Sequence, residues 1–195
     1  RMDSLMVAAN IRNLSLLELF YTCVSNLCKI MNERGTKIPD EQHHYIEKDD
    51  YNKCIYHKRD MDATERTIVV MKDADILIKI CDSTGDFDDT SEYQLLIRLL
   101  KEHTIIDDDG SRRLRQKEEV ENPSEVLLNP SDPEATFRYK AGGKHLGYVG
   151  NIVESVGENG SLIIDYDYQP NTYADNQFMK DYLKRKKRFL DRKST

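Results

Sequence analysis

The sequence predicts an α+β protein, and three observations lead to this class. The first ten residues are apolar and branched enough for a strand. The long segment that follows places apolar residues at helical spacing, interrupted by polar stretches. Two further apolar segments, joined by Gly157-Glu158-Asn159-Gly160, then indicate a β-hairpin followed by a last amphipathic helix. We therefore expect an antiparallel three-stranded sheet backed by helices.

Composition limits the class of protein further. A chain of 195 residues can bury one core, or one core plus a helical insertion. No apolar run approaches the roughly 18 residues that a membrane span needs, and the first residues do not have the order of a signal peptide. The four cysteines show no CxxC spacing, which favours reduced thiols. We expect a cytoplasmic protein without a membrane partner.

Residues 13–32 carry the clearest helical signal. Ser15 and Glu18 are spaced as a capping box, in which each side chain accepts a hydrogen bond from the other residue's backbone. Apolar residues recur behind them at helical spacing until Gly35 and Pro39 end the pattern. We expect a helix here that packs through one apolar face.

The rest of the long middle segment is less regular. A second helix is expected from Asp62 to about Ile80, and a short third helix from Ser91. Residues 36–60 are polar and irregular, and 107–135 are expected to be mostly loop, with one helical turn where the sequence reads LRQKEEVE.

The hairpin and the last helix follow from local signals. Apolar and aromatic residues mark strands at 145–156 and 161–168, and the Asn-Gly between them favours a tight turn. Pro170 ends the second strand, and Thr172 is expected to cap the helix. Four apolar residues of that helix share one face, namely Phe178, Met179, Tyr182 and Leu183.

Two regions carry motifs in a fixed order. Met2-Asp3-Ser4 opens the first strand, and SDPEA precedes the hairpin within 129–183. In combination these motifs resemble the DDE transposases of bacterial insertion sequences. The resemblance implies a partial RNase H-like fold. Residues 1–12 would form its first strand, 13–128 a mainly helical insertion, and 129–195 its hairpin and helix.

The resemblance also implies a chemistry. In the family, the acid of this first strand is a carboxylate of a two-metal site, which here is Asp3 as catalytic residue and metal ligand. Two Mg²⁺ ions about 3.5–4 Å apart activate the nucleophile and stabilise the leaving oxygen, and carboxylate oxygens suit them. The resemblance implies that the substrate is DNA at transposon terminal inverted repeats, which the parent enzyme cuts and joins. It also suggests a homodimer.

The family's second Asp and its Glu have no counterpart in this chain. We therefore expect a fragment that is inactive alone. The alternative is a non-catalytic remnant that still binds DNA or a partner subunit. The middle segment is open to the same two roles, since its helices suit packing as well as contact with DNA or a partner.

Basic residues supply the candidate DNA contacts. The formal net charge is −6, so contact with phosphate depends on local patches rather than on the whole chain. One patch surrounds Ala141-Gly142-Gly143 and the other runs from Lys184 to Arg188. A solvated loop and a solvated helix face are the competing interpretations. The candidates are Arg138, Lys140, Lys144, His145, Lys184, Arg185, Lys187 and Arg188.

Three other clusters have weaker signals. Asp165 and Asp167 share one face of a strand, either as paired carboxylates or as a polar outer surface. The spacing of His43, His44, Cys54 and His57 does not fit a zinc site. The arginines at 112–115 follow acidic residues 107–109 closely, so local ion pairing competes with any role in DNA binding.

Overall fold

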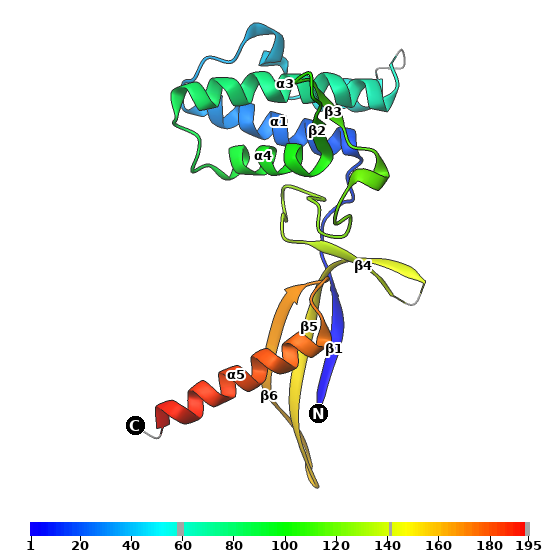
Figure 1. Cartoon of the computed structure of the whole chain (residues 1–195), viewed down its shortest axis with the longest axis vertical. Coiled ribbons are helices and arrows are strands. Elements are labelled where there is room, and N and C mark those ends of the chain that lie inside the picture. The colour runs from blue at the N-terminus through cyan, green and yellow to red at the C-terminus, as the bar shows by residue number, and fades with distance from the viewer. Residues whose placement is uncertain (58–60, 141, 194–195) are drawn as a thin grey trace. The chain divides into compact units, whose positions relative to one another are not determined.

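The chain is an α+β protein with antiparallel sheets, as the sequence predicts. The computed structural model describes residues 1–57, 61–140 and 142–193. It divides into two compact units (Figure 1). Unit 1 comprises Arg1–Asn10 with Glu134–Thr195, and unit 2 comprises Ile11–Pro133. Among the described residues, no helix is long and apolar enough to cross a membrane.

Unit 1 is built on a sheet whose central strand is β5. Its described strands are β1 (Met2–Ala8), β4 (Thr136–Lys140), β5 (Gly143–Gly157) and β6 (Gly160–Pro170). β1 pairs antiparallel with β5, from Met2 opposite Val153 to Ala8 opposite Gly147. β6 pairs antiparallel with the later part of β5, and β4 with its first residues. The three predicted strands are therefore joined by a fourth, β4, which the sequence analysis did not predict.

The pairing register assigns each side chain of unit 1 to one of two faces, because directly paired residues point to the same side of a sheet. One face carries Val149, Asn151 and Val153 of β5, which are all buried. Helix α5 (Asp175–Lys193) lies across this face (Figure 1). Phe178 of α5 is buried as well. The other face carries Tyr166 and Tyr168, which are exposed.

The β5–β6 hairpin turns over two residues, Glu158 and Asn159, with Gly157 paired to Gly160. The register then shifts between Val153 and Glu154, which leaves one extra residue on β6. Such a bulge changes which side chains face the helix. The strand ends beyond it are exposed, including Val156, Leu162, Ile163 and Ile164.

Gly147 is required where β1 crosses β5. Its φ is +137°, and a Cβ there would lie 2.3 Å from the carbonyl oxygen of Val7 and 2.5 Å from the backbone nitrogen of Ala9. Any side chain would therefore push the two strands apart.

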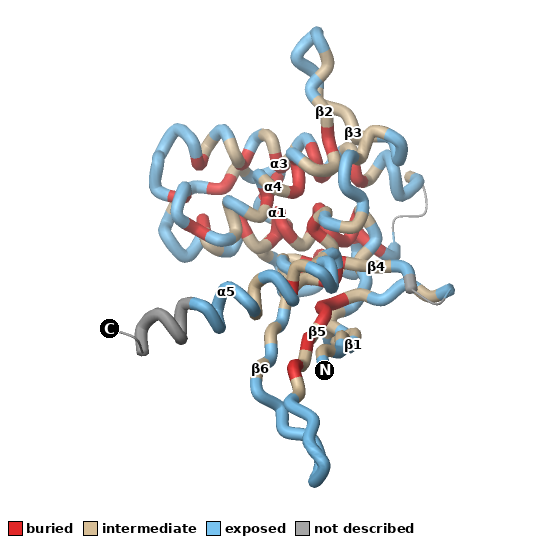
Figure 2. The backbone as a smooth tube through the Cα atoms, turned by 60° about the horizontal axis from the view of Figure 1, so that its bottom comes forward, coloured by how far each residue is buried: buried red, intermediate tan, exposed pale blue. Residues whose placement is uncertain are grey.

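Unit 2 is a helical unit with its own core. Its long helices among the described residues are α1 (Leu16–Glu33), α3 (Ala63–Thr84) and α4 (Ser91–His103). Buried residues follow these helices and the middle of β5 (Figure 2). The largest fully buried side chains of the unit include Phe20, Leu27, Met31, Met71, Leu77, Leu96 and Leu99. The capping box of Ser15 and Glu18 is confirmed, and Asp62 with Glu65 forms a second one.

Several sequence predictions for local structure were wrong. Within 36–60 lie a 3-10 helix (Asp40–Ile46), a single α-turn (α2, Asp50–Asn52) and a π-helix (Lys53–His57). Buried Tyr45, whose hydroxyl donates to Asp73, anchors this polar segment to α3. The last helix begins at Asp175, so Thr172 is not its N-cap.

The predicted loop after α4 also contains structure. A small hairpin pairs β2 (Thr104–Ile106) with β3 (Arg112–Leu114). The helical turn expected near LRQKEEVE is a 3-10 turn at Lys117–Glu119. Strands this short carry too little alternation for a sequence pattern to reveal them.

Candidate nucleic-acid interface

The first candidate patch is a two-stranded ribbon made by β4 and the first residues of β5. Arg138 pairs with His145, Tyr139 with Lys144, and Lys140 with Gly143. The competing interpretation of this patch was a solvated loop, but its described residues are mostly regular strand. Because residues alternate sides along a strand, Lys144 points to one side of the ribbon and Arg138 to the other. The side chain of Lys140 lies outside the described residues.

Aromatic rings are interleaved with the cations of this ribbon. The Lys144 ammonium lies 4.1 Å from the centre of the Phe137 ring, a cation–π contact. The Phe137 and Tyr139 rings pack edge to face with their centroids 5.8 Å apart, and Tyr139 is exposed. No carboxylate among the described residues forms a salt bridge with Arg138 or Lys144. Both cations are therefore available to an external anion.

The sequence around the ribbon lacks acidic residues. Residues 135–153 contain no Asp or Glu, although the chain as a whole is acidic. The residues of unit 1 include 12 Lys and Arg against 9 Asp and Glu, whereas those of unit 2 include 17 against 26. The formal charge is therefore +3 for unit 1 and −9 for unit 2. Net charge therefore favours contact with a polyanion at unit 1 over unit 2.

The basic run of α5 is only partly available. The Arg185 guanidinium donates to Asp165 at 2.7 Å and to Asp167 at 2.7 Å. Its role in the fold is thus to hold α5 on β6. Lys184 lies 3.6 Å from Asp181, and Lys187 is exposed. The side chain of Arg188 lies outside the described residues.

The same contacts argue against both interpretations of Asp165 and Asp167. The two carboxylates face α5 and pair with one guanidinium, that of Arg185. They therefore form neither an open polar surface nor a paired-carboxylate site. Burial acts to raise the pKa of Asp167, but hydrogen bonds from Arg185 and from the Tyr168 backbone outweigh it. The pKa of Asp167 is consequently lowered, and the carboxylate stays ionised.

Asp3 lies on β1 directly opposite Ile152 of β5. Its side chain is 70% exposed and forms a salt bridge with Arg1 at 3.1 Å. It also accepts a hydrogen bond from the Ser4 backbone at 3.0 Å. Within the described ranges, no three His, Cys, Asp or Glu side chains gather closely enough to hold a metal ion. The described residues therefore do not bring three such ligands together around Asp3.

The histidine and cysteine cluster of unit 2 is engaged in packing. The Nδ1 atom of His44 lies 2.7 Å from the Asp50 carboxylate, which also accepts from the Tyr21 hydroxyl at 2.6 Å. Cys54 is buried, whereas His57 is exposed. Sequence reasoning missed this network because its members are far apart in the chain.

Two of the three arginines at 112–115, Arg112 and Arg113, form ion pairs within unit 2. Arg112 binds Asp75 at 2.8 Å, and Arg113 binds Asp107 at 3.0 Å and Glu119 at 2.8 Å. This agrees with the local ion pairing that the sequence suggested. Their charges are largely neutralised by these partners.

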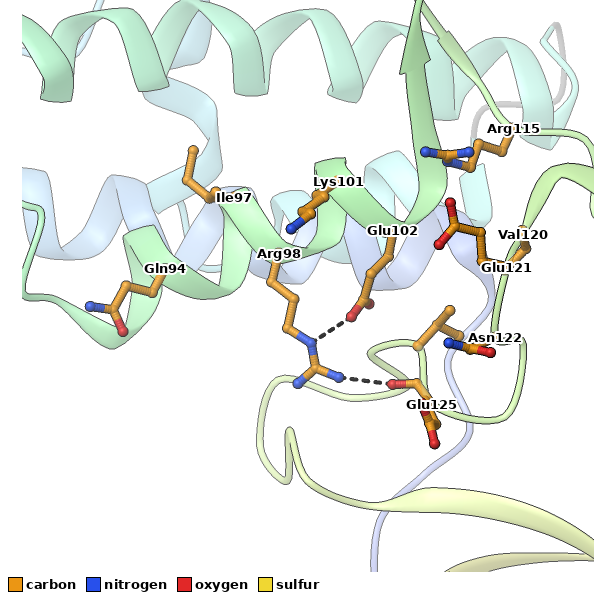
Figure 3. Close-up of a pocket in the computed structure, with 11 residues that line it drawn as sticks. Gln94, Ile97, Arg98, Lys101, Glu102, Arg115, Val120, Glu121, Asn122 and Glu125 are labelled. Atoms are coloured by element: carbon orange, nitrogen blue, oxygen red, sulfur yellow. Dashed lines mark hydrogen bonds and ion pairs between the residues drawn. The ribbon is translucent and has the colours of Figure 1, made fainter. Parts of the chain in front are cut away.

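Unit 2 also contains a cavity of about 550 Å³ beside α4 (Figure 3). Arg98 crosses it and binds Glu102 at 2.7 Å and the Glu125 carbonyl oxygen at 2.9 Å. Lys101 and Glu121 also line it, so its wall carries both signs of charge. Such a wall does not favour a polyanion.

No protein-family model, curated protein or solved structure matches this chain.

Proposed function

We propose that the chain is part of a bacterial insertion-sequence DDE transposase, that it binds DNA through unit 1, and that it does not cut DNA alone. The observation that carries the proposal is the ribbon of β4 and β5. It presents Arg138 and Lys144 without acidic partners in a region free of Asp and Glu. Lysine and arginine fix a protein on the phosphate backbone, and a two-stranded ribbon fits the major groove.

The arrangement of unit 1 supports the RNase H-like fold that this proposal implies. β1 lies beside β5, β6 lies on the other side of β5, and α5 follows across one face. An RNase H-like sheet begins with this order, and Asp3 then stands on the strand that carries the first metal-binding acid.

Catalysis needs more than this carboxylate. Bound Mg²⁺ ions would activate the attacking oxygen and stabilise the leaving one. The described residues contain no group of three His, Cys, Asp or Glu side chains that could hold a metal ion. We therefore propose DNA binding without cleavage by this chain alone.

The binding test uses fluorescence anisotropy with a labelled duplex between 50 and 200 mM NaCl. We expect affinity to fall steeply with salt, because each phosphate contact contributes about 0.9 to the slope of log K against log salt. Arg138→Gln with Lys144→Gln should reduce that slope by about 2. Lys79→Gln with Lys101→Gln, in unit 2, is the matched control. Absence of duplex binding at 50 mM NaCl would contradict the proposal.

The cleavage test uses supercoiled DNA and Mg²⁺. We expect no nicking by the full chain, with or without Asp3→Ala. Nicking that disappears in Asp3→Ala would show a complete catalytic site, and this part of the proposal would then be wrong.

A further inference from the structure

The face of unit 1 opposite α5 carries exposed apolar and aromatic side chains. The register places Leu5, Gly150 and Tyr168 in one row across β1, β5 and β6. The next row holds Asp3, Ile152 and Tyr166. These side chains share a face because directly paired residues point to the same side. We call the surface formed by Leu5, Ile152, Tyr166 and Tyr168 the tyrosine face.

The two tyrosines of this face present flat rings to solvent. Tyr166 is 78% exposed and Tyr168 is 52% exposed. The Tyr168 ring stacks on Tyr148, with centroids 4.6 Å apart and planes 24° apart. Tyr148 is buried, so it supports Tyr168 from one side. Contiguous exposed apolar patches on proteins, when large, mark interaction sites.

The spacing of the rings defines which ligand fits. Tyr166 and Tyr168 are two residues apart on one strand, so their Cα atoms are about 6.8 Å apart. Stacked bases in one strand of a duplex are about 3.4 Å apart. Two neighbouring bases therefore reach both rings only when they are unstacked, as in an extended single strand.

The charged groups on this side of the sheet have both signs. Asp165 and Asp167 of β6 point to the opposite face and are paired with Arg185. Asp3 is paired with Arg1, and Glu154, two residues beyond Ile152 on β5, shares this face. Lys144 of β5 lies on the same side, six residues or about 20 Å before Gly150, whereas Arg138 of β4 points to the other side.

We propose that the tyrosine face binds single-stranded DNA, with successive bases stacked on Tyr166 and Tyr168 and a phosphate further along the bound strand held by Lys144. Aromatic side chains accept any base by stacking, and basic grooves follow the backbone. This inference rests on the proposed function for the identity of the nucleic acid. It adds that the bound DNA is unpaired.

The placement of Asp3 gives this binding a consequence. Asp3 and Tyr166 lie in one row, two strand spacings or about 9.5 Å apart. A strand stacked on Tyr166 therefore passes close to the carboxylate that the proposed function assigns to metal binding.

The test compares labelled 12-nucleotide oligo-dT with a 12-base-pair duplex, by anisotropy on the full chain at 50 mM NaCl. Removing one stacking ring should weaken single-strand binding about 5- to 150-fold. We expect that loss for Tyr166→Ala and Tyr168→Ala. Tyr166→Phe keeps the ring and should bind within about twofold of the unaltered chain. Tyr166 is mostly exposed, so far-UV circular dichroism should show an unchanged fold.

Each outcome separates the two proposals. Loss of oligo-dT binding in both alanine variants, with duplex binding retained, supports the tyrosine face. Unchanged oligo-dT binding in both variants overturns it, and the proposed function still stands if duplex binding depends on Arg138 and Lys144. Failure of the unaltered chain to bind either DNA overturns both.

Discussion

Unit 1 and unit 2 use their apolar residues in opposite ways. Of the 15 large apolar side chains that the described residues expose, 10 belong to unit 1, although it is the shorter unit. The contiguous buried cluster lies wholly in unit 2, from Leu17 to Leu127. Unit 2 therefore buries most of its large apolar side chains in its own core. Unit 1 leaves more aromatic and aliphatic side chains exposed to solvent.

The charges of the two units differ in the same direction. Unit 2 is strongly acidic, and its arginines at 112 and 113 are bound by its own carboxylates. Unit 1 is net basic and leaves Arg138 and Lys144 without acidic partners among the described residues. This difference is the basis of the proposal that unit 1 carries the interaction surfaces. The predictions below test this contrast.

The largest effect is expected in the core of unit 2. Leu27 is fully buried, so Leu27→Ala should lower the free energy of unfolding by about 2–5 kcal/mol through lost burial and a residual cavity. Urea unfolding followed by circular dichroism at 222 nm measures this. Ile76→Ala, at a half-exposed position of α3, is the control. Equal losses of unfolding free energy in the two variants would mean that unit 2 lacks the tight core described above.

A smaller effect is expected where β1 meets β5. Gly147→Ala places a Cβ against the backbone of Val7 and Ala9 and strains a residue with φ of +137°. We expect a loss of about 1–3 kcal/mol, with faster hydrogen exchange in β1. Gly150→Ala is the matched control, because its Cβ would lie 3.6 Å from side-chain atoms of Leu5 and Val7, an ordinary contact. Similar exchange in both variants would contradict the close approach at Gly147.

The contact between α5 and β6 should contribute less. Arg185→Gln removes two ion pairs, but the Arg185 side chain is 45% exposed, so we expect a loss of at most about 1 kcal/mol. The pKa of Asp167 is lowered in the folded chain, so its contribution is present above the unfolded pKa and is lost as pH falls through the folded pKa. In Arg185→Gln, an NMR titration should show a higher pKa for Asp167 than in the unaltered chain. In the control variant, Lys184→Gln, the pKa of Asp167 should change less.

The smallest effect concerns the pH dependence of unit 2. Burial lowers the pKa of His103 below its ordinary value near 6.5, and its Nε2 atom finds no partner among the described residues. The unfolded chain therefore binds the proton more readily, so the free energy of unfolding falls as pH decreases below about 6.5. His103→Gln should flatten this dependence between pH 6.5 and 5 in denaturant titrations. His57→Gln, at an exposed position, should not.

Much of the local structure was predictable from neighbouring residues. The capping box at Ser15, the helices from Asp62 and Ser91 and the turn after Gly157 were all expected, because each depends on residues within one turn of chain. The 3-10 and π segments between 40 and 57 were not. They are held by distant partners such as Asp73, which contacts Tyr45 and Gln42.

The candidate site was predictable only as a set of residues. The sequence by itself determined that basic residues surround positions 141–143, that Asp3 stands in a strand, and that Asp165 and Asp167 share a face. Tertiary structure alone decided that the first group forms a ribbon with Phe137 and Tyr139, and that Arg185 neutralises the two aspartates. The physical reason is that alternation along a strand, which the sequence shows, fixes which residues of that strand share a face. The pairing register between strands and the bulge on β6 decide which residues of other elements pack against that face, and these depend on distant parts of the chain.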